Sequence, residues 1–173
     1  MSYNKSKSLV ANVDAISTAM KIRIDDRQAT DSEKEVLSRY SGFGGIKEVL
    51  NIGTGHAVSN DMDEPIRRLQ NLIEAYPYYD DDMRKSVIDS IKSSVLTAFY
   101  TPKFLVEAVA RQIHATFKDK GLQMRSFLEP SAGIGGFLPV AMPGTRRYAF
   151  EKDSLTGLIL SLLHDEATTI TAG

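Results

Sequence analysis

The chain has 173 residues, of which 42% are hydrophobic, and its formal net charge at pH 7 is −1. A chain of this length and hydrophobic content can bury the core of one domain, or of one domain with an appendage. Its near-zero net charge gives no global electrostatic argument for binding to nucleic acid or to an anionic membrane. The absence of cysteine excludes disulfides, thiolate metal sites and cysteine nucleophiles. With no run of about 18 apolar residues and no apolar signal segment, we expect a cytoplasmic protein without a membrane partner.

Residues 1–95 carry the pattern of several helices. Thr30 and Glu33 have the spacing of a capping box, which predicts a helix from residue 31 that continues through Tyr40 and ends at the glycines of 42–45. A short helical turn should follow at 46–50, then a loop over 51–63. Asp80 begins an acidic run that should cap a further helix. Apolar residues at helical spacing mark one apolar face on each of three helices: Val10, Val13, Ile16 and Met20; Ile66, Leu69, Leu72 and Ile73; Met83, Val87, Ile88 and Ile91.

Residues 96–173 carry a different pattern. Thr101 followed by Pro102 is typical of a helix start, with the hydroxyl as the cap, and that helix should run to about 116 or 117 and be broken by Gly121. The pattern after Gly121 predicts six further elements in this order: an apolar run at 126–128, a glycine turn, a short helix at 137–141, a strand at 147–151, a helix at 154–163 and a strand at 167–171. This order predicts an α/β region with a parallel sheet behind a helical N-terminal region.

Two glutamates accompany the glycine turn. Ligands bind at the carboxyl ends of the strands in an open parallel sheet, and Glu129, the glycines Gly133 and Gly135, and Glu151 all fall at such ends. Glycine lets a ligand approach the backbone closely because it has no Cβ. An acid at the end of the second strand, as Glu151 is, commonly hydrogen bonds the ribose hydroxyls of an adenosine cofactor.

The residues around the turn narrow the choice of cofactor. A dinucleotide fingerprint requires a third glycine where this chain has Leu138, and no lysine follows the turn before Lys152, as a phosphate-cradling loop would need. A carboxylate at Glu129 would repel a pyrophosphate but would suit a ligand that carries an ammonium and no phosphate. S-adenosylmethionine is such a ligand. The alternative is an ordinary strand-to-helix turn with no ligand.

The segment 129–137, Glu-Pro-Ser-Ala-Gly-Ile-Gly-Gly-Phe, resembles the first cofactor motif of the adenine-N6 DNA methyltransferases. Residues 98–102 resemble the segment that these enzymes place before it and close over the methionine end of the cofactor, and Phe150–Asp153 resembles their second motif. Residues 37–45 resemble a segment of very large methylase–helicase proteins of phages and conjugative elements. The resemblance covers roughly residues 30–170.

The resemblance implies an incomplete Rossmann-like S-adenosylmethionine-dependent domain over 96–173, a DNA partner, a helicase domain in the same polypeptide, and a setting in restriction–modification or mobile elements. It implies that the cofactor is bound by Phe99, Tyr100, Thr101, Pro102, Glu129, Pro130, Ala132, Gly133, Gly135 and Glu151.

The sequence departs from this family at the catalytic motif. These enzymes hold the flipped adenine with Asn/Asp/Ser-Pro-Pro-aromatic, and none of the six prolines here is followed by another. We therefore expect a piece of a larger enzyme, natural or deliberately shortened, that binds cofactor and is not active alone. We also expect self-association, because the third strand would be left as an exposed edge.

A rival interpretation is a non-catalytic module that docks DNA or a helicase and uses the glycine turn structurally. Methyl transfer to RNA or protein is a third. Two basic groups bear on the rival. Arg111, Lys118, Lys120 and Arg125 cluster against Glu107 and Asp119, and Arg146 and Arg147 form the second group. The pattern favours solvated helix and strand ends over phosphate binding for both groups. The histidines His56, His114 and His164 share no ligand spacing, and we expect surface or interface positions and no metal.

Overall fold

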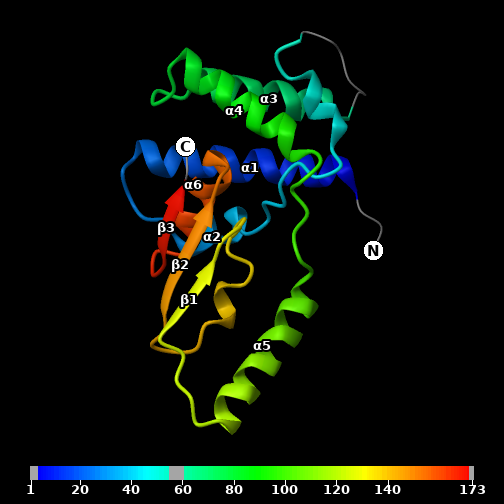
Figure 1. Cartoon of the computed structure of the whole chain (residues 1–173). Helices are drawn as coiled ribbons and strands as arrows, with labels where there is room; N and C mark the ends of the chain where they lie inside the picture. Colours follow the sequence, from blue (N-terminus) through cyan, green and yellow to red (C-terminus); the bar gives the residue numbers. More distant parts are fainter. Residues whose placement is uncertain (1–3, 55–60, 172–173) are drawn as a thin grey trace. The chain divides into compact units, whose positions relative to one another are not determined.

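The computed structural model describes residues 4–54 and 61–171, and its contacts divide the chain into two compact units, 1–99 and 100–173 (Figure 1). The sequence pattern predicts this boundary between residues 95 and 96. His56 and residues 55–60 of the expected loop lie outside the described residues.

The first unit is helical. Its elements are α1 (Lys5–Ile24), α2 (Asp31–Leu37), the 3₁₀ helix η1 (Lys47–Asn51), α3 (Asp63–Ala75) and α4 (Asp81–Ser94). Helix α1 packs against α2 and α3, and α4 packs against α3 and η1. Asn12 is buried in α1, where its amide group donates to the carbonyl of Gly42 at 2.6 Å and accepts from the N–H of Ser41 at 2.8 Å. A buried amide with both ends bonded holds the segment after α2 in place.

The helix starts of this unit are as predicted, but one helix end is not. Thr30 and Glu33 form the complete capping box, and Asp80 accepts from the N–H of Met83 at the start of α4. Helix α2, however, ends at Leu37 instead of the glycines of 42–45, so Tyr40 lies beyond it. Tyr40 is nevertheless buried, with its ring edge-on to Phe43. Val10 of α1 and Met83 of α4, both predicted on the apolar face of their helix, are 38% and 50% exposed.

The second unit is α/β. It contains α5 (Lys103–Asp119), β1 (Ser126–Glu129), the 3₁₀ helix η2 (Leu138–Val140), β2 (Arg146–Glu151), α6 (Ser154–Leu163) and β3 (Thr168–Thr171). The three strands lie side by side in the order β1-β2-β3, and both pairs are parallel (Figure 1). The predicted α/β region with a parallel sheet is therefore confirmed. Helix α6 packs against β2 and β3, and α5 packs against η2.

Two local predictions in this unit are wrong. Pro102 occupies the N-cap of α5 and no side chain caps that helix, so the Thr101 hydroxyl does not have the expected role. The helix expected at 137–141 is only the short η2. Ala141 already has extended backbone angles, and Met142 precedes Pro143, a position at which helical angles are sterically disfavoured.

The core of this unit lies between the sheet and the segment after the glycine turn. Its buried cluster and the partly buried residues packed on it are Ala132, Leu138, Ala149, Leu160, Phe127 and Ala167. Strand β2 is central, so β1 is an edge strand as well as β3, which the sequence analysis did not foresee. A parallel sheet places all three carboxyl ends on one side, and this brings the glycine turn and Glu151 together.

Candidate functional site

The glycine turn is tied to the end of β2 through its own backbone. The N–H of Ala132 donates to the carbonyl of Phe150 at 2.9 Å, and the N–H of Gly133 donates to Oε2 of Glu151 at 2.8 Å. The other oxygen of Glu151 accepts from the N–H of Asp153 at 2.9 Å. Glu151 thus holds the turn after β1 and the chain after β2 with a single carboxylate.

Tyr100 lies directly on Gly133. This glycine has a left-handed backbone with φ +55°, and a Cβ built on it would be 2.7 Å from Cε1 of Tyr100. The Tyr100 hydroxyl shares a hydrogen bond with the side chain of Thr156 in α6, and burial raises the pKa of the phenol. The aromatic segment upstream therefore reaches across the glycine turn to the start of α6.

A histidine holds the other side of the turn. Nε2 of His164, which follows α6, is 3.0 Å from the carbonyl oxygen of Ile134. Gly135 has φ +81°, and a Cβ there would be 2.6 Å from the same nitrogen. Nδ1 of His164 faces Glu166 at 3.7 Å, and Glu166 also accepts from Arg147 at 3.0 Å. Only glycine leaves room for the imidazole at position 135.

Glu129 is the buried acid of the site. Its side chain is 7% exposed, Oε1 accepts from the N–H of Phe137 at 3.1 Å, and Oε2 is buried without a hydrogen-bond partner among the described residues. Burial raises the pKa of Glu129 to about 7. A buried carboxyl oxygen without a donor is costly, and a cationic donor would offset that cost.

The structure brings together most of the predicted cofactor residues. Tyr100, Ala132, Gly133, Gly135, Glu129 and Glu151 all contact the turn or form it. Phe99 belongs to the helical unit, where its ring lies near Gly44. Thr101 and Pro102 are exposed at the start of α5, and Pro130 is exposed at the start of the turn.

Three residues of the site were not predicted. Asp153 caps α6 by accepting from the N–H of Thr156 at 2.7 Å. An aspartate directly before an apolar helical segment indicates an N-cap, so this role could have been predicted from the sequence. The contacts of Thr156 with Tyr100 and of His164 with the turn join residues far apart in sequence, and no local pattern marks them.

The site offers carboxyl groups and hydroxyls at the carboxyl ends of the strands. Glu129, Glu151 and Asp153 line the carboxyl ends of β1 and β2, which suits a ligand with a cationic group and with hydroxyls that donate hydrogen bonds. In residues 4–54 and 61–171 no group of three His, Asp or Glu is placed to hold a metal. In the same part of the chain, no helix combines the length and the apolar character needed to cross a bilayer.

Comparison with known proteins found no match: no family model fits the chain, and searches of curated proteins and of solved structures returned nothing similar.

Proposed function

We propose that residues 100–173 form the cofactor-binding part of an S-adenosylmethionine-dependent adenine-N6 DNA methyltransferase with a Rossmann-like sheet. The observation that carries the proposal is the placement of the Tyr100 ring on Gly133. The motif resemblance requires an upstream aromatic segment beside the glycine turn, and 33 positions of chain separate these two residues in the sequence (133 minus 100). Backbone pattern alone would not bring them into contact.

Two of the three carboxyl groups, those of Glu129 and Glu151, have a matching part of the cofactor, whereas Asp153 caps α6. The partnerless Oε2 of Glu129 is an acceptor for the cofactor's ammonium group. Glu151 is half-buried, and each of its oxygens has a lone pair left beyond its one backbone bond, which could accept from the ribose hydroxyls. The cofactor supplies a methyl group on a positively charged sulfonium, and the surrounding acids favour that charge.

Two features of the chain bear on how the cofactor would bind. The Tyr100 ring packs so closely on Gly133 that it must shift before a ligand can reach this glycine. The sequence holds no Pro-Pro-aromatic motif for a flipped adenine, so the proposal covers cofactor binding and not the transfer step.

Calorimetric titration of the chain with S-adenosylhomocysteine, with a nicotinamide dinucleotide as the control ligand, tests the proposal. We expect binding of the first only, weakened in Glu151→Ala and unchanged in Glu107→Gln, which removes an exposed carboxylate from α5. Glu129→Gln should weaken binding because a neutral amide oxygen accepts from an ammonium more weakly than a carboxylate does. Equal affinity of the Glu151 and Glu107 variants, or binding of the dinucleotide, would contradict the assignment.

One observation favours the rival, a DNA- or helicase-docking module. The N–H groups of Gly133 and Asp153 both donate to the carboxylate of Glu151. A turn whose backbone donors are paired in this way is stable without a ligand. No heat with S-adenosylhomocysteine, together with measurable DNA affinity, would support this alternative.

A further inference from the structure

Glu129 ends β1 on the apolar face of the sheet. Alternate residues of a strand share a face, so the Glu129 side chain lies on the face of Phe127, and the register places Ala149 of β2 beside it. Phe127 packs against the buried apolar cluster, to which Ala149 belongs. Oε1 has one donor, the N–H of Phe137, and the buried Oε2 has no donor among the described residues. A negative charge on this carboxyl is therefore costly in the free protein.

The ionisable groups on the surrounding elements are engaged elsewhere. Their hydrogen-bond or ion-pair partners are the following: Gly133 for Glu151, Thr156 for Asp153 and for Tyr100, Glu166 for Arg147, Val140 for His114 and Ile134 for His164. The turn at 130–137, η2 and β3 contain no ionisable residue, and Lys152 and the Lys, Arg, Asp and Glu side chains of α5 are exposed. Among the described residues, none of these groups bonds to Glu129.

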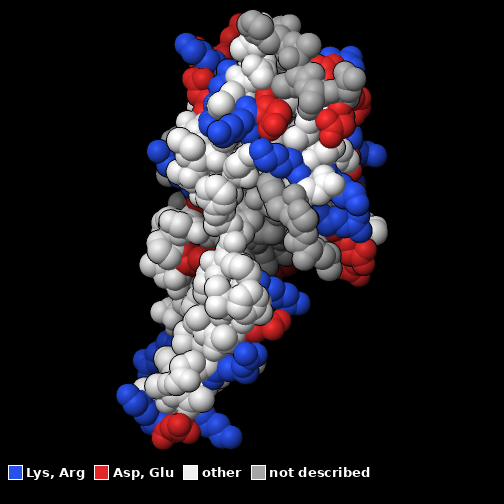
Figure 2. All heavy atoms as spheres, turned by 90° about the vertical axis from the view of Figure 1, so that its right-hand side faces the viewer, with Lys and Arg blue, Asp and Glu red and all other residues white. Residues whose placement is uncertain are grey.

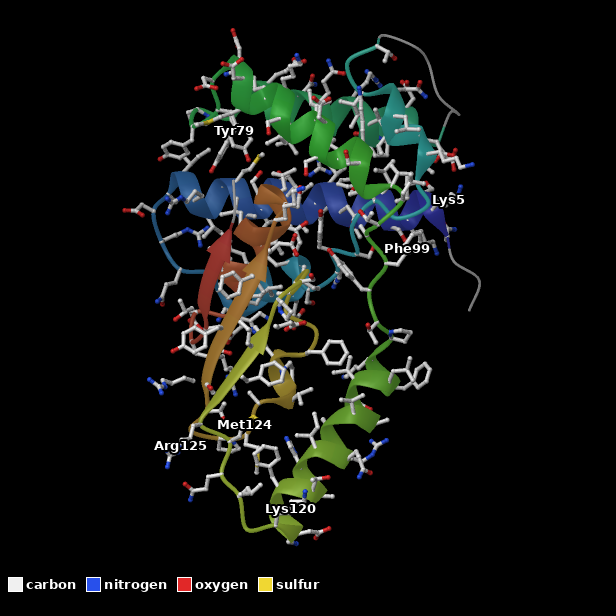
Figure 3. All side chains as sticks on the ribbon, in the orientation of Figure 1. Lys5, Tyr79, Phe99, Lys120, Met124 and Arg125 are labelled. Carbon is white, nitrogen blue, oxygen red and sulfur yellow. The ribbon has the colours of Figure 1, made fainter. Side chains whose placement is uncertain are left out.

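Exposed basic side chains of this unit gather away from the carboxyl ends of the strands. Figure 3 shows Arg125 at the start of β1 and Lys120 at the end of α5, and Figure 2 shows Lys and Arg side chains gathered at that end of α5. Four residues of extended chain, about 13 Å, separate Arg125 from Glu129. These cations are therefore not placed to offset a charge on Glu129.

The same surroundings raise the pKa of the Glu129 carboxyl. Burial raises this pKa to about 7, and the N–H groups of Phe137 and Leu138 oppose the rise. No charged side chain is among the causes. The free carboxyl is therefore mostly protonated below about pH 7. A cation beside a carboxyl favours the ionised form, so a ligand that brings one changes the number of bound protons.

We propose that Glu129 couples cofactor binding to the release of one proton. In the free protein the carboxyl keeps its proton. When the ammonium group of the cofactor donates to Oε2, the O–H bond of the carboxyl breaks, the proton passes to solvent, and a carboxylate–ammonium pair remains. The ammonium keeps its own charge, so one proton leaves for each cofactor bound. This inference rests on the proposed function, because its cation is that of S-adenosylmethionine.

The coupling fixes how affinity depends on pH. Below about pH 7 the binding equilibrium includes the lost proton, so the dissociation constant should rise about tenfold for each pH unit that the pH is lowered. At pH 6 about 0.9 proton should be released for each ligand bound. Above about pH 7 the carboxyl is already ionised, so the dissociation constant should be level and the proton release should fall toward zero.

The test is calorimetric titration of the full chain with S-adenosylhomocysteine, at several pH values, in pairs of buffers that differ in ionisation enthalpy. The part of the heat that depends on the buffer gives the number of protons released. The control ligand is 5′-methylthioadenosine, which has the same adenosine and thioether but no ammonium, and it should release no proton from Glu129. NMR titration of the ¹³C-labelled Glu129 side chain without ligand measures its pKa directly, and we expect about 7.

Glu129→Gln keeps a neutral side chain of the same shape, and it should abolish both the proton release and the pH dependence of the affinity. Glu107→Gln, which removes an exposed carboxyl of α5, should retain both. Equal proton release in wild type and Glu129→Gln, or titration of Glu129 near its ordinary value of about 4.3, would overturn the inference and leave the proposed function standing. Failure of S-adenosylhomocysteine to bind at any pH would overturn both.

Discussion

Replacing Gly133 with alanine tests the contact on which the proposed site depends. The left-handed backbone at φ +55° costs a residue with a Cβ about 1–2 kcal/mol. The new methyl group would lie 2.7 Å from the Tyr100 ring, so the ring must move, and its hydrogen bond with Thr156 would be lost. A lost hydrogen bond of this kind costs about 0.5–1.5 kcal/mol. We therefore expect Gly133→Ala to lower the free energy of unfolding by about 1.5–3.5 kcal/mol.

Gly144→Ala is the matched control. Gly144 also has a left-handed backbone, with φ +79°, but a Cβ there meets no atom within 4 Å. This substitution should cost only the backbone strain of about 1–2 kcal/mol. The difference between the two variants measures the displacement of Tyr100.

The assay is urea unfolding followed by NMR, with the amide peaks of β2 as reporters because the chain has no tryptophan. A second Gly133→Ala variant in a Tyr100→Ala background completes a double-mutant cycle. Removing the ring should reduce the cost of Gly133→Ala to that of Gly144→Ala. Equal costs for the two glycines in the wild-type background, or additive effects in the cycle, would refute the reasoning.

Three further predictions concern charges and caps of the same unit. Burial raises the pKa of Glu129 to about 7, above the value of about 4.3 expected in the unfolded chain, so the folded state binds this proton more tightly. The stability of the α/β unit should therefore be highest below about pH 4.3 and fall, by at most about 1.4 kcal/mol per pH unit, as the pH rises to about 7. Urea midpoints at several pH values should show this fall in wild type and not in Glu129→Gln, and a Gln variant with the same slope would contradict it. His164→Ala should speed hydrogen exchange of the Gly135 amide, which donates to Ala132 at 2.8 Å, and His164→Gln should restore protection because it keeps a donor for Ile134. Equal exchange in both variants would show that the imidazole bond does not hold the turn. Asp153→Ala should lower the free energy of unfolding by about 1 kcal/mol through loss of the α6 cap. Asp80→Ala, the same change at the cap of α4, should leave the unfolding seen by the β2 amide peaks unchanged. An equal shift of those peaks in both variants would argue against a local cap effect.

Local sequence signals predicted the elements whose cause is itself local. The capping box at Thr30, the Asp80 cap, the α6 range from Ser154 to Leu163 and the strand ending at Glu151 follow from side chains within a few residues of each backbone group. The same local logic failed at two positions. At Tyr40 apolar spacing continued the helix, although the backbone leaves helical geometry after Leu37. At Thr101 the Thr-Pro pattern predicted a cap, but Pro102 is the N-cap and the helix begins at Lys103.

The sequence by itself determined that an acid, a glycine turn and a second acid occupy the ends of two strands, because chain order and the parallel rule place them there. Tertiary structure alone decided that Tyr100 covers Gly133, that His164 fills the space beside Gly135, and that Oε2 of Glu129 is left without a donor. These contacts join residues distant in sequence, and they depend on how the strands align and on which backbone can be approached closely. The periodicity of apolar residues in the sequence carries no information about strand alignment or about which backbone can be approached closely.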